Sequence, residues 1–167
     1  MKSSRQILNG ILLAVCAAMP LLASADTISI YVTRHGEKAS DGKDPDLTPE
    51  GQQRARHIAS MVKDAGIKQV FSTTYKRTQQ TAQATADKLG VPVQTYDPGK
   101  HAEFAQQLRK LRSNTLVVGH SNTVPDLVRQ LGGDPGSDIP ETEYNRLYHI
   151  TVADDGTVAT TLLSSQK

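Results

Sequence analysis

Cysteine and aromatic residues are scarce in this chain of 167 residues, which has one Cys, no Trp and two Phe. The single Cys16 lies in an apolar N-terminal stretch, so the rest of the chain can form no disulfide and offers no thiolate as nucleophile or metal ligand. The sequence also lacks internal repeats, a linker to a second domain and a basic tail. These absences leave one domain without thiol chemistry.

The first 25 residues have the composition of a secretory signal peptide. Lys2 and Arg5 precede a mostly apolar stretch over residues 7–22, and Ala23-Ser24-Ala25 has the small-x-small pattern of a cleavage site. The alternative is an uncleaved membrane anchor, but Asn9, Gly10 and Pro20 interrupt the stretch, which is short for a spanning helix. We predict a signal peptide over 1–25 and a mature domain over 26–167.

This prediction places the mature protein in the periplasm or outside the cell, with no stable membrane insertion after cleavage. Lipid attachment at Cys16 is disfavoured because Val15 is bulky where such signals have a small residue. Of the 19 Lys and Arg residues, Lys2 and Arg5 precede the cleavage site, whereas all 17 Asp and Glu residues follow it. The mature chain is thus electrically neutral, which argues against nucleic acid as a partner.

Residues 27–163 alternate strand-like and helix-like segments. Apolar or β-branched runs predict strands over 27–33, 68–72, 92–96, 115–118, 144–152 and 157–163. Helices are predicted from Pro49 to a stop at Gly66, from a cap at Thr73 or Thr74 to Leu89, and over 101–112 and 122–131. The pattern predicts an α/β three-layer sandwich: a mainly parallel sheet, helices on both faces and an antiparallel edge hairpin around Asp154-Asp155-Gly156.

Two histidines follow predicted strands directly. Arg34-His35-Gly36 ends the first strand, and Gly119-His120-Ser121-Asn122 ends the strand over 115–118. Ligands bind at the carboxyl ends of strands in open α/β sheets. The planar donor fork of Arg34 matches phosphate oxygens, and the same positive charge favours a neutral, nucleophilic His35.

Arg77 stands in the first turn of the predicted second helix, where the helix dipole disfavours a cation. An anion shared with the helix N-terminus would explain this placement, although an ordinary solvated arginine is an equal alternative on this segment alone. No histidine pair has metal-ligand spacing. Tyr144 and Tyr148 alternate with Leu147 and are interpreted as sheet packing.

These segments together resemble the histidine phosphatase superfamily, which has the phosphoglycerate-mutase-like fold, in order and spacing over nearly all of residues 27–163. Arg34-His35-Gly36 resembles its nucleophile motif, residues 72–82 its second-arginine segment and Gly119-His120 its second-histidine motif. The resemblance implies that His35 becomes phosphorylated and that Arg34, Arg77 and His120 hold the phosphate. Water would then hydrolyse the phosphohistidine, with no metal or other cofactor required.

The proton donor to the leaving group is the altered part of the pattern. Larger relatives carry a glutamate after the third strand, where this chain has Asp97, which could equally be a turn residue before Pro98. Glu37, Glu141 and Glu143 are alternatives. The chain also lacks the long helical insertion of many relatives, which predicts an open site for bulky phosphates.

The sequence thus predicts a compact, secreted phosphatase acting on a phosphorylated small molecule or an envelope glycan, such as a lipopolysaccharide sugar phosphate. A phosphomutase, a protein phosphohistidine phosphatase and a non-catalytic phosphate-binding module are the alternatives. Export disfavours the first two, whose cofactor or usual substrates are cytosolic, and the intact His35 disfavours the third.

Overall fold

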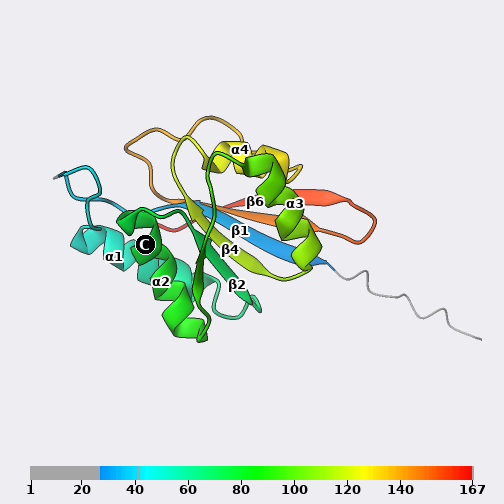
Figure 1. Ribbon diagram of the computed structural model, residues 1–167, viewed down its shortest axis with the longest axis horizontal. Helices are drawn as coiled ribbons and strands as arrows, with labels where there is room; N and C mark the ends of the chain where they lie inside the picture. Colours follow the sequence, from blue (N-terminus) through cyan, green and yellow to red (C-terminus); the bar gives the residue numbers. More distant parts are fainter. Residues whose placement is uncertain (1–26, 41, 167) are drawn as a thin grey trace, which may run out of the picture.

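The computed structural model describes residues 27–40 and 42–166, and the predicted signal peptide lies outside them. Its elements run in the order β1 (Ile28–Arg34), α1 (Pro49–Met61), β2 (Gln69–Ser72), α2 (Lys76–Leu89), β3 (Val93–Thr95), α3 (His101–Leu111), β4 (Thr115–Gly119), α4 (Val124–Gln130), β5 (Arg146–Val152) and β6 (Val158–Ser164). In the described part these strands form one sheet of six, in the spatial order β3-β2-β4-β1-β5-β6 (Figure 1).

The sheet has the predicted mixture of strand directions. Strands β1 to β4 run parallel, β5 is antiparallel to β1, and β6 is antiparallel to β5. The hairpin turns at Gly156, whose φ of 86° suits a residue without Cβ, and it closes with a hydrogen bond from the Ala153 N–H to the Thr157 carbonyl. The predicted fold class is confirmed.

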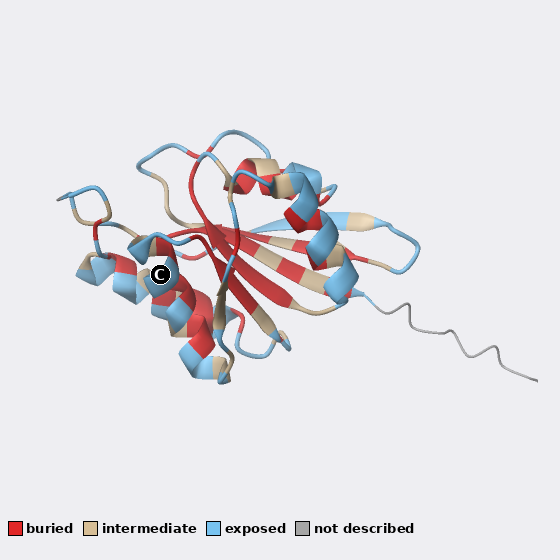
Figure 2. Ribbon diagram, viewed as in Figure 1, coloured by how far each residue is buried: buried red, intermediate tan, exposed pale blue. Residues whose placement is uncertain are grey.

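Helices cover both faces of the sheet, which gives the three layers (Figure 1). On one face α1 and α2 pack on the sheet through Ile58, Val62, Val70, Ala82, Leu116, Val118 and Leu147. On the other face α3 and α4 enclose Ile30, Val32, Phe104, Leu108, Val117, Leu127 and Ile150. Burial follows the central strands and the helix sides that face them (Figure 2). The strand ends are therefore anchored in a rigid core.

Helix α1 begins as the sequence predicts. Thr48 is its N-cap and accepts a hydrogen bond from the Gly51 N–H at 3.1 Å, Pro49 is its first residue, and Glu50 stands in the first turn. The C-terminal end of the chain lies beside this helix (Figure 1), where the Arg54 guanidinium donates to the Ser165 carbonyl.

Helix α2 begins later than predicted, and its cap is different. The predicted caps Thr73 and Thr74 are wrong, because the helix starts at Lys76 and its N-cap residue Tyr75 makes no capping hydrogen bond. Asp44, from the segment between β1 and α1, instead accepts the Lys76 N–H at 3.0 Å. A residue distant in sequence thus supplies the acid that the helix N-terminus favours.

Helix α4 also starts two residues later than predicted, at Val124. The His120 carbonyl accepts hydrogen bonds from the N–H groups of Thr123 and Val124, so a turn separates β4 from the helix. Within residues 27–40 and 42–166, no helix has the length and apolar character needed to span a bilayer.

Candidate active site

Adjacent strands bring the two histidines to the same sheet edge. Arg34 pairs with Gly119 in the parallel register of β1 and β4, so His35 and His120 leave the sheet side by side. The His35 N–H donates to the Gly119 carbonyl at 3.0 Å, and the two imidazole rings meet edge-on with centroids 5.5 Å apart. The structure therefore places the two histidines side by side at the carboxyl ends of their strands, as the sequence predicts.

The orientation of the His35 ring is fixed by its own backbone neighbour. Its Nδ1 lies 2.7 Å from the Gly36 carbonyl oxygen. Because a carbonyl only accepts, Nδ1 must carry the proton, and in the neutral ring Nε2 keeps its lone pair. Arg77 donates its Nε–H to this Nε2 at 3.2 Å. The unprotonated nitrogen of His35 therefore faces Arg77.

Both imidazoles are held neutral. Burial lowers the pKa of His35 to about 3, and the positive charges of Arg34 and Arg77 add to this effect. Burial lowers the pKa of His120 to about 4, again with help from Arg77 and Arg34. At neutral pH Nε2 of His35 is consequently unprotonated and accepts the hydrogen bond from Arg77.

Arg77 lies between the two histidines. In addition to its bond to His35, its Nη2 lies 3.5 Å from Nδ1 of His120. Its guanidinium stacks on the ring of Tyr75, with 4.4 Å to the ring centre, and its Nη1 lies 3.8 Å from the Asp44 carboxylate. Arg77, a cation in the first turn of α2, therefore has the Asp44 carboxylate as an electrostatic partner and lies beside both imidazoles.

Arg34 is buried, with 1% of its side chain exposed, and it organises the loop before β5. Its Nη1 donates to the carbonyls of Pro140, Glu141 and Glu143, and its Nη2 donates to the Glu141 carboxylate at 2.7 Å. Tyr144 stacks on the guanidinium, 4.1 Å away. The Nε–H is buried and has no hydrogen-bond partner among the described residues, so it remains available to an anionic ligand.

A chain of two threonine hydroxyl groups fixes the orientation of the His120 ring. Its Nε2 lies 3.0 Å from the Thr73 hydroxyl, which in turn lies 2.7 Å from the hydroxyl of Thr78. Thr78 donates to the Tyr75 carbonyl at 2.7 Å. The single proton of the Thr78 hydroxyl is used there, so Thr73 donates to Thr78 and accepts from Nε2 of His120. This chain leaves Nδ1 of His120 facing Arg77.

These groups surround one open cleft of about 320 Å³. It is lined by Arg34, His35, Lys38, Tyr75, Arg77, Pro98, His120, Ser121, Asn122, Thr123 and Glu141. Two arginines and a lysine face it against a single carboxylate, so the cleft attracts anions. All four residues predicted to hold or attack a phosphate, Arg34, His35, Arg77 and His120, border this space.

The four candidate proton donors differ in their contacts and in whether they border the cleft. Asp97 is exposed and its carboxylate accepts the Gly99 N–H at 2.8 Å, the turn role that the sequence left open. Glu37 is bound by Arg54, and Glu143 by Arg146. Among them, the carboxylate of Glu141 is the one that borders the cleft, so the structure favours Glu141 over the first choice, Asp97.

A family comparison places this geometry among known proteins. The model of the histidine phosphatase superfamily (branch 1) matches residues 30–98, which contain Arg34, His35 and Arg77. The chain belongs to the histidine phosphatase superfamily.

Curated relatives of this histidine phosphatase chain are longer. "Probable phosphoglycerate mutase GpmB" of Enterobacter sp. (strain 638) is 30% identical over 106 residues, which are 59% of this chain and 45% of the relative. "6-phosphofructo-2-kinase/fructose-2,6-bisphosphatase 4" of Rattus norvegicus is 40% identical over 75 residues, 41% of this chain and 15% of the relative. The chain therefore spans less than half the length of these two proteins.

Solved structures share the fold over most of the chain. The protein histidine phosphatase SixA complexed with tungstate has a TM-score of 0.68 and 23% identity, covering 83% of this chain and 97% of that one. Phosphoserine phosphatase of Entamoeba histolytica in complex with 3-phosphoglyceric acid has a TM-score of 0.60 and 16% identity, covering 83% and 98%. At these identities the likeness concerns the fold.

Several residues at this histidine phosphatase site were not predicted from the sequence. Tyr144 was predicted to be sheet packing, but it stacks on Arg34 just before β5 begins. Tyr75, Thr73 and Lys38 carry no motif of their own, and only the folded chain places them at the cleft or behind it. Tyr75 offered one weak signal, because an aromatic residue two positions before Arg77 can stack on it.

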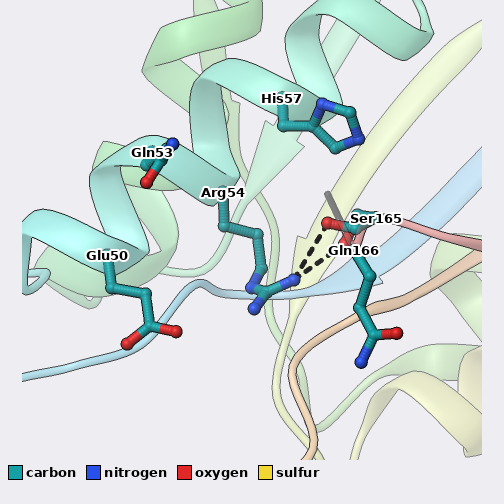
Figure 3. Close-up of a pocket in the computed structure, with 6 residues that line it drawn as sticks. All are labelled: Glu50, Gln53, Arg54, His57, Ser165 and Gln166. Atoms are coloured by element: carbon teal, nitrogen blue, oxygen red, sulfur yellow. Dashed lines mark hydrogen bonds between the residues drawn. The ribbon is translucent and has the colours of Figure 1, made fainter.

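A second hollow against α1 differs in character (Figure 3). It is lined by Glu50, Gln53, Arg54, His57, Ser165 and Gln166. Arg54 already donates to Ser165 and to the Glu37 carboxylate, so its charge is neutralised before any ligand arrives. Within residues 27–40 and 42–166, no three His, Cys, Asp or Glu side chains gather in a way that could hold a metal ion.

Proposed function

We propose that this histidine phosphatase superfamily member hydrolyses phosphate monoesters through a phosphohistidine on His35. One observation carries the proposal: the Gly36 carbonyl holds the proton of His35 on Nδ1, so that the Nε2 lone pair faces the anion-attracting cleft beside Arg77. A site that only bound phosphate would gain nothing from a neutral imidazole oriented in this way.

In the first step, His35 Nε2 attacks phosphorus and the bond from phosphorus to the ester oxygen breaks. The free Nε–H of Arg34 and the guanidinium of Arg77 are placed to hold the phosphoryl oxygens, with His120 on the other side of Arg77. Such donors stabilise the charge that spreads over the transferring group. Water then attacks the phosphohistidine, which releases inorganic phosphate and restores the neutral imidazole.

The substrate that we propose is a phosphorylated small molecule or envelope glycan outside the cytoplasm, such as a lipopolysaccharide sugar phosphate. The signal-peptide composition of residues 1–25 supports the location. The open cleft, with Lys38 and the 42% exposed Tyr75 at its border, suits a phosphate that projects from a larger sugar. Phosphorylated sugars of the envelope meet both conditions.

The test compares the purified protein with its His35→Ala variant on p-nitrophenyl phosphate in the presence of a chelator. We expect turnover by the parent only, and a phosphorylated protein trapped by rapid acid-free quenching that is absent from the variant. His35→Ala removes the nucleophile, so the loss should reach at least about 10³-fold. A variant with parental turnover would refute the phosphohistidine route, and phosphate binding without turnover in either protein would indicate a binding module.

A further inference from the structure

Glu141 has an unusual position for an acidic residue. It belongs to the loop before β5, yet its Oε2 accepts from Arg34 at 2.7 Å and its Oε1 accepts from the hydroxyl of Ser121, the residue after His120. The carboxylate therefore links the residues that end β1 and follow β4, at the border of the cleft. Its side chain is 75% exposed, so solvent reaches it. A carboxylate beside a phosphate-binding cluster weakens binding of a dianion and calls for another explanation.

Other carboxylates cannot take the same place. Asp97 accepts from the Gly99 N–H, Glu37 is held by Arg54 on the side of α1, and Glu143 is paired with Arg146. Asp44 lies 3.8 Å from Arg77, but it caps helix α2 through the Lys76 N–H. None of these four side chains borders the cleft.

We propose that Glu141 is the catalytic acid that protonates the leaving oxygen, supplied by the loop before β5. The inference rests on the proposed function, because it needs a phosphoryl transfer to His35. Arg34 has a further part in it: by donating to the carbonyls of Pro140, Glu141 and Glu143, the same buried arginine that faces the phosphate fixes the loop that carries the acid.

The proton balance closes over one cycle. As the His35 Nε2 lone pair bonds to phosphorus, the ester bond breaks and the carboxyl proton of Glu141 passes to the departing oxygen, which leaves as an alcohol. Water then attacks phosphorus while the Glu141 carboxylate takes one water proton. The bond from phosphorus to His35 breaks, and phosphate leaves with the hydroxyl. His35 is again neutral and Glu141 again protonated.

Substrate binding itself prepares the acid. The hydrogen bond from Ser121 and the charge of Arg34 hold the pKa of Glu141 below its usual value. An arriving phosphate, bound at the Nε–H of Arg34, shares the positive charge of this guanidinium and places a second negative charge beside the carboxylate. Both changes raise the pKa of Glu141, so it gains its proton when the substrate is present.

The experiment compares Glu141→Gln with the parent on a series of aryl phosphates of similar size. Gln keeps the shape of Glu and one oxygen that can accept from Arg34, its amide NH2 can donate to the hydroxyl oxygen of Ser121, and it has no carboxyl proton to transfer. We expect kcat/KM on phenyl phosphate, whose phenolate is a strong base, to fall by about 10²–10⁴-fold. On p-nitrophenyl phosphate, whose anion leaves without a proton, we expect a fall of less than about tenfold.

Glu143→Gln is the matched control, since it makes the same change two residues away on a side chain outside the cleft. Its kcat/KM on both substrates should lie within about threefold of the value for the parent. If Glu141→Gln lowers kcat/KM equally on both substrates, or lowers KM with kcat unchanged, the acid role is overturned. His35 would still be the proposed nucleophile. If instead the parent forms no phosphohistidine and hydrolyses none of the series, the proposed function fails and this inference with it.

Discussion

His35 and His120 gain their chemistry from being buried beside arginines. A histidine in water is half protonated near pH 6.5, and a protonated His35 has no lone pair on Nε2. Burial and the neighbouring guanidinium groups lower the pKa to about 3 for His35 and about 4 for His120. The fold thereby keeps Nε2 of His35, the nucleophile that we propose, unprotonated at neutral pH. The same burial makes the free energy of unfolding depend on pH.

We predict that acid destabilises the parent more than the variant His35→Asn. Above pH 6.5 His35 is neutral in both the folded and the unfolded chain, so it adds no pH dependence. As the pH falls below 6.5, the unfolded chain binds a proton that the folded chain, with its pKa near 3, does not bind. The free energy of unfolding should therefore fall by up to about 2 kcal/mol more in the parent between pH 7 and pH 5.

Urea unfolding of both proteins at pH 7 and pH 5 measures this difference. Asn suits the comparison because its amide reaches the Gly36 carbonyl much as Nδ1 does, without a titrating group. Equal losses in the two proteins would mean that His35 is protonated freely in the folded state.

At the scale of elements, two glycines fit the nucleophile segment against helix α1. A Cβ on Gly36 would lie 2.6 Å from the Gly51 carbonyl oxygen, and a Cβ on Gly51 would lie 2.1 Å from the carbonyl oxygen of Glu37. Backbone therefore touches backbone at the point where the chain leaves β1. The close approach fixes residues 36–37, which directly follow His35, against helix α1.

Gly51→Ala should consequently destabilise the protein, although Ala favours a helix interior over Gly by about 1 kcal/mol. The added methyl group has no space and must separate α1 from residues 36–37, which we expect to cost about 1–3 kcal/mol. Turnover of p-nitrophenyl phosphate should fall as well, since His35 shifts with its neighbour.

Gln53→Ala serves as the control, because this side chain is exposed on the same helix. It should change the free energy of unfolding by less than about 0.5 kcal/mol in the same denaturant titration. An unchanged or raised stability of Gly51→Ala would show that the two backbones can separate freely.

At the scale of the whole molecule, every described strand and helix follows the predicted signal peptide. Strand β1 begins at Ile28, and the six-stranded sheet is built from residues 28–164. Removal of residues 1–25 would thus take no strand or helix from this fold. The remaining chain has equal numbers of basic and acidic side chains, so the positive potential is a local property of the cleft.

We predict that export removes residues 1–25, so that the mature protein begins at Asp26. Ala23-Ser24-Ala25 provides the small side chains that a signal peptidase requires at its cleavage site. Mass spectrometry of the protein recovered from the periplasm or medium measures the N-terminus directly. A mass that still includes Met1 would contradict cleavage, and recovery in the cytosol alone would contradict export.

Local sequence pattern was sufficient to predict the order of strands and helices and the fold class. Alternating strand and helix periodicity predicted the parallel sheet and its edge hairpin, because side-chain period and turn chemistry act over a few neighbouring residues. The placement of His35 and His120 also followed from sequence, since each directly ends a strand and parallel strands end at one edge.

Contacts between distant segments decided the rest. Asp44 caps α2 from 32 residues away, in place of the adjacent Thr73 or Thr74. Glu141 reaches Arg34 across 107 residues, whereas the nearer choice, Asp97, is used in a turn. The sequence favoured Asp97 for its position after the third strand, with three glutamates as alternatives, and nothing in periodicity or propensity shows which carboxylate meets a residue far away in the chain. Only the packed sheet, which sets the direction of each loop, brings the carboxylate of Glu141 to the cleft that His35 and His120 border.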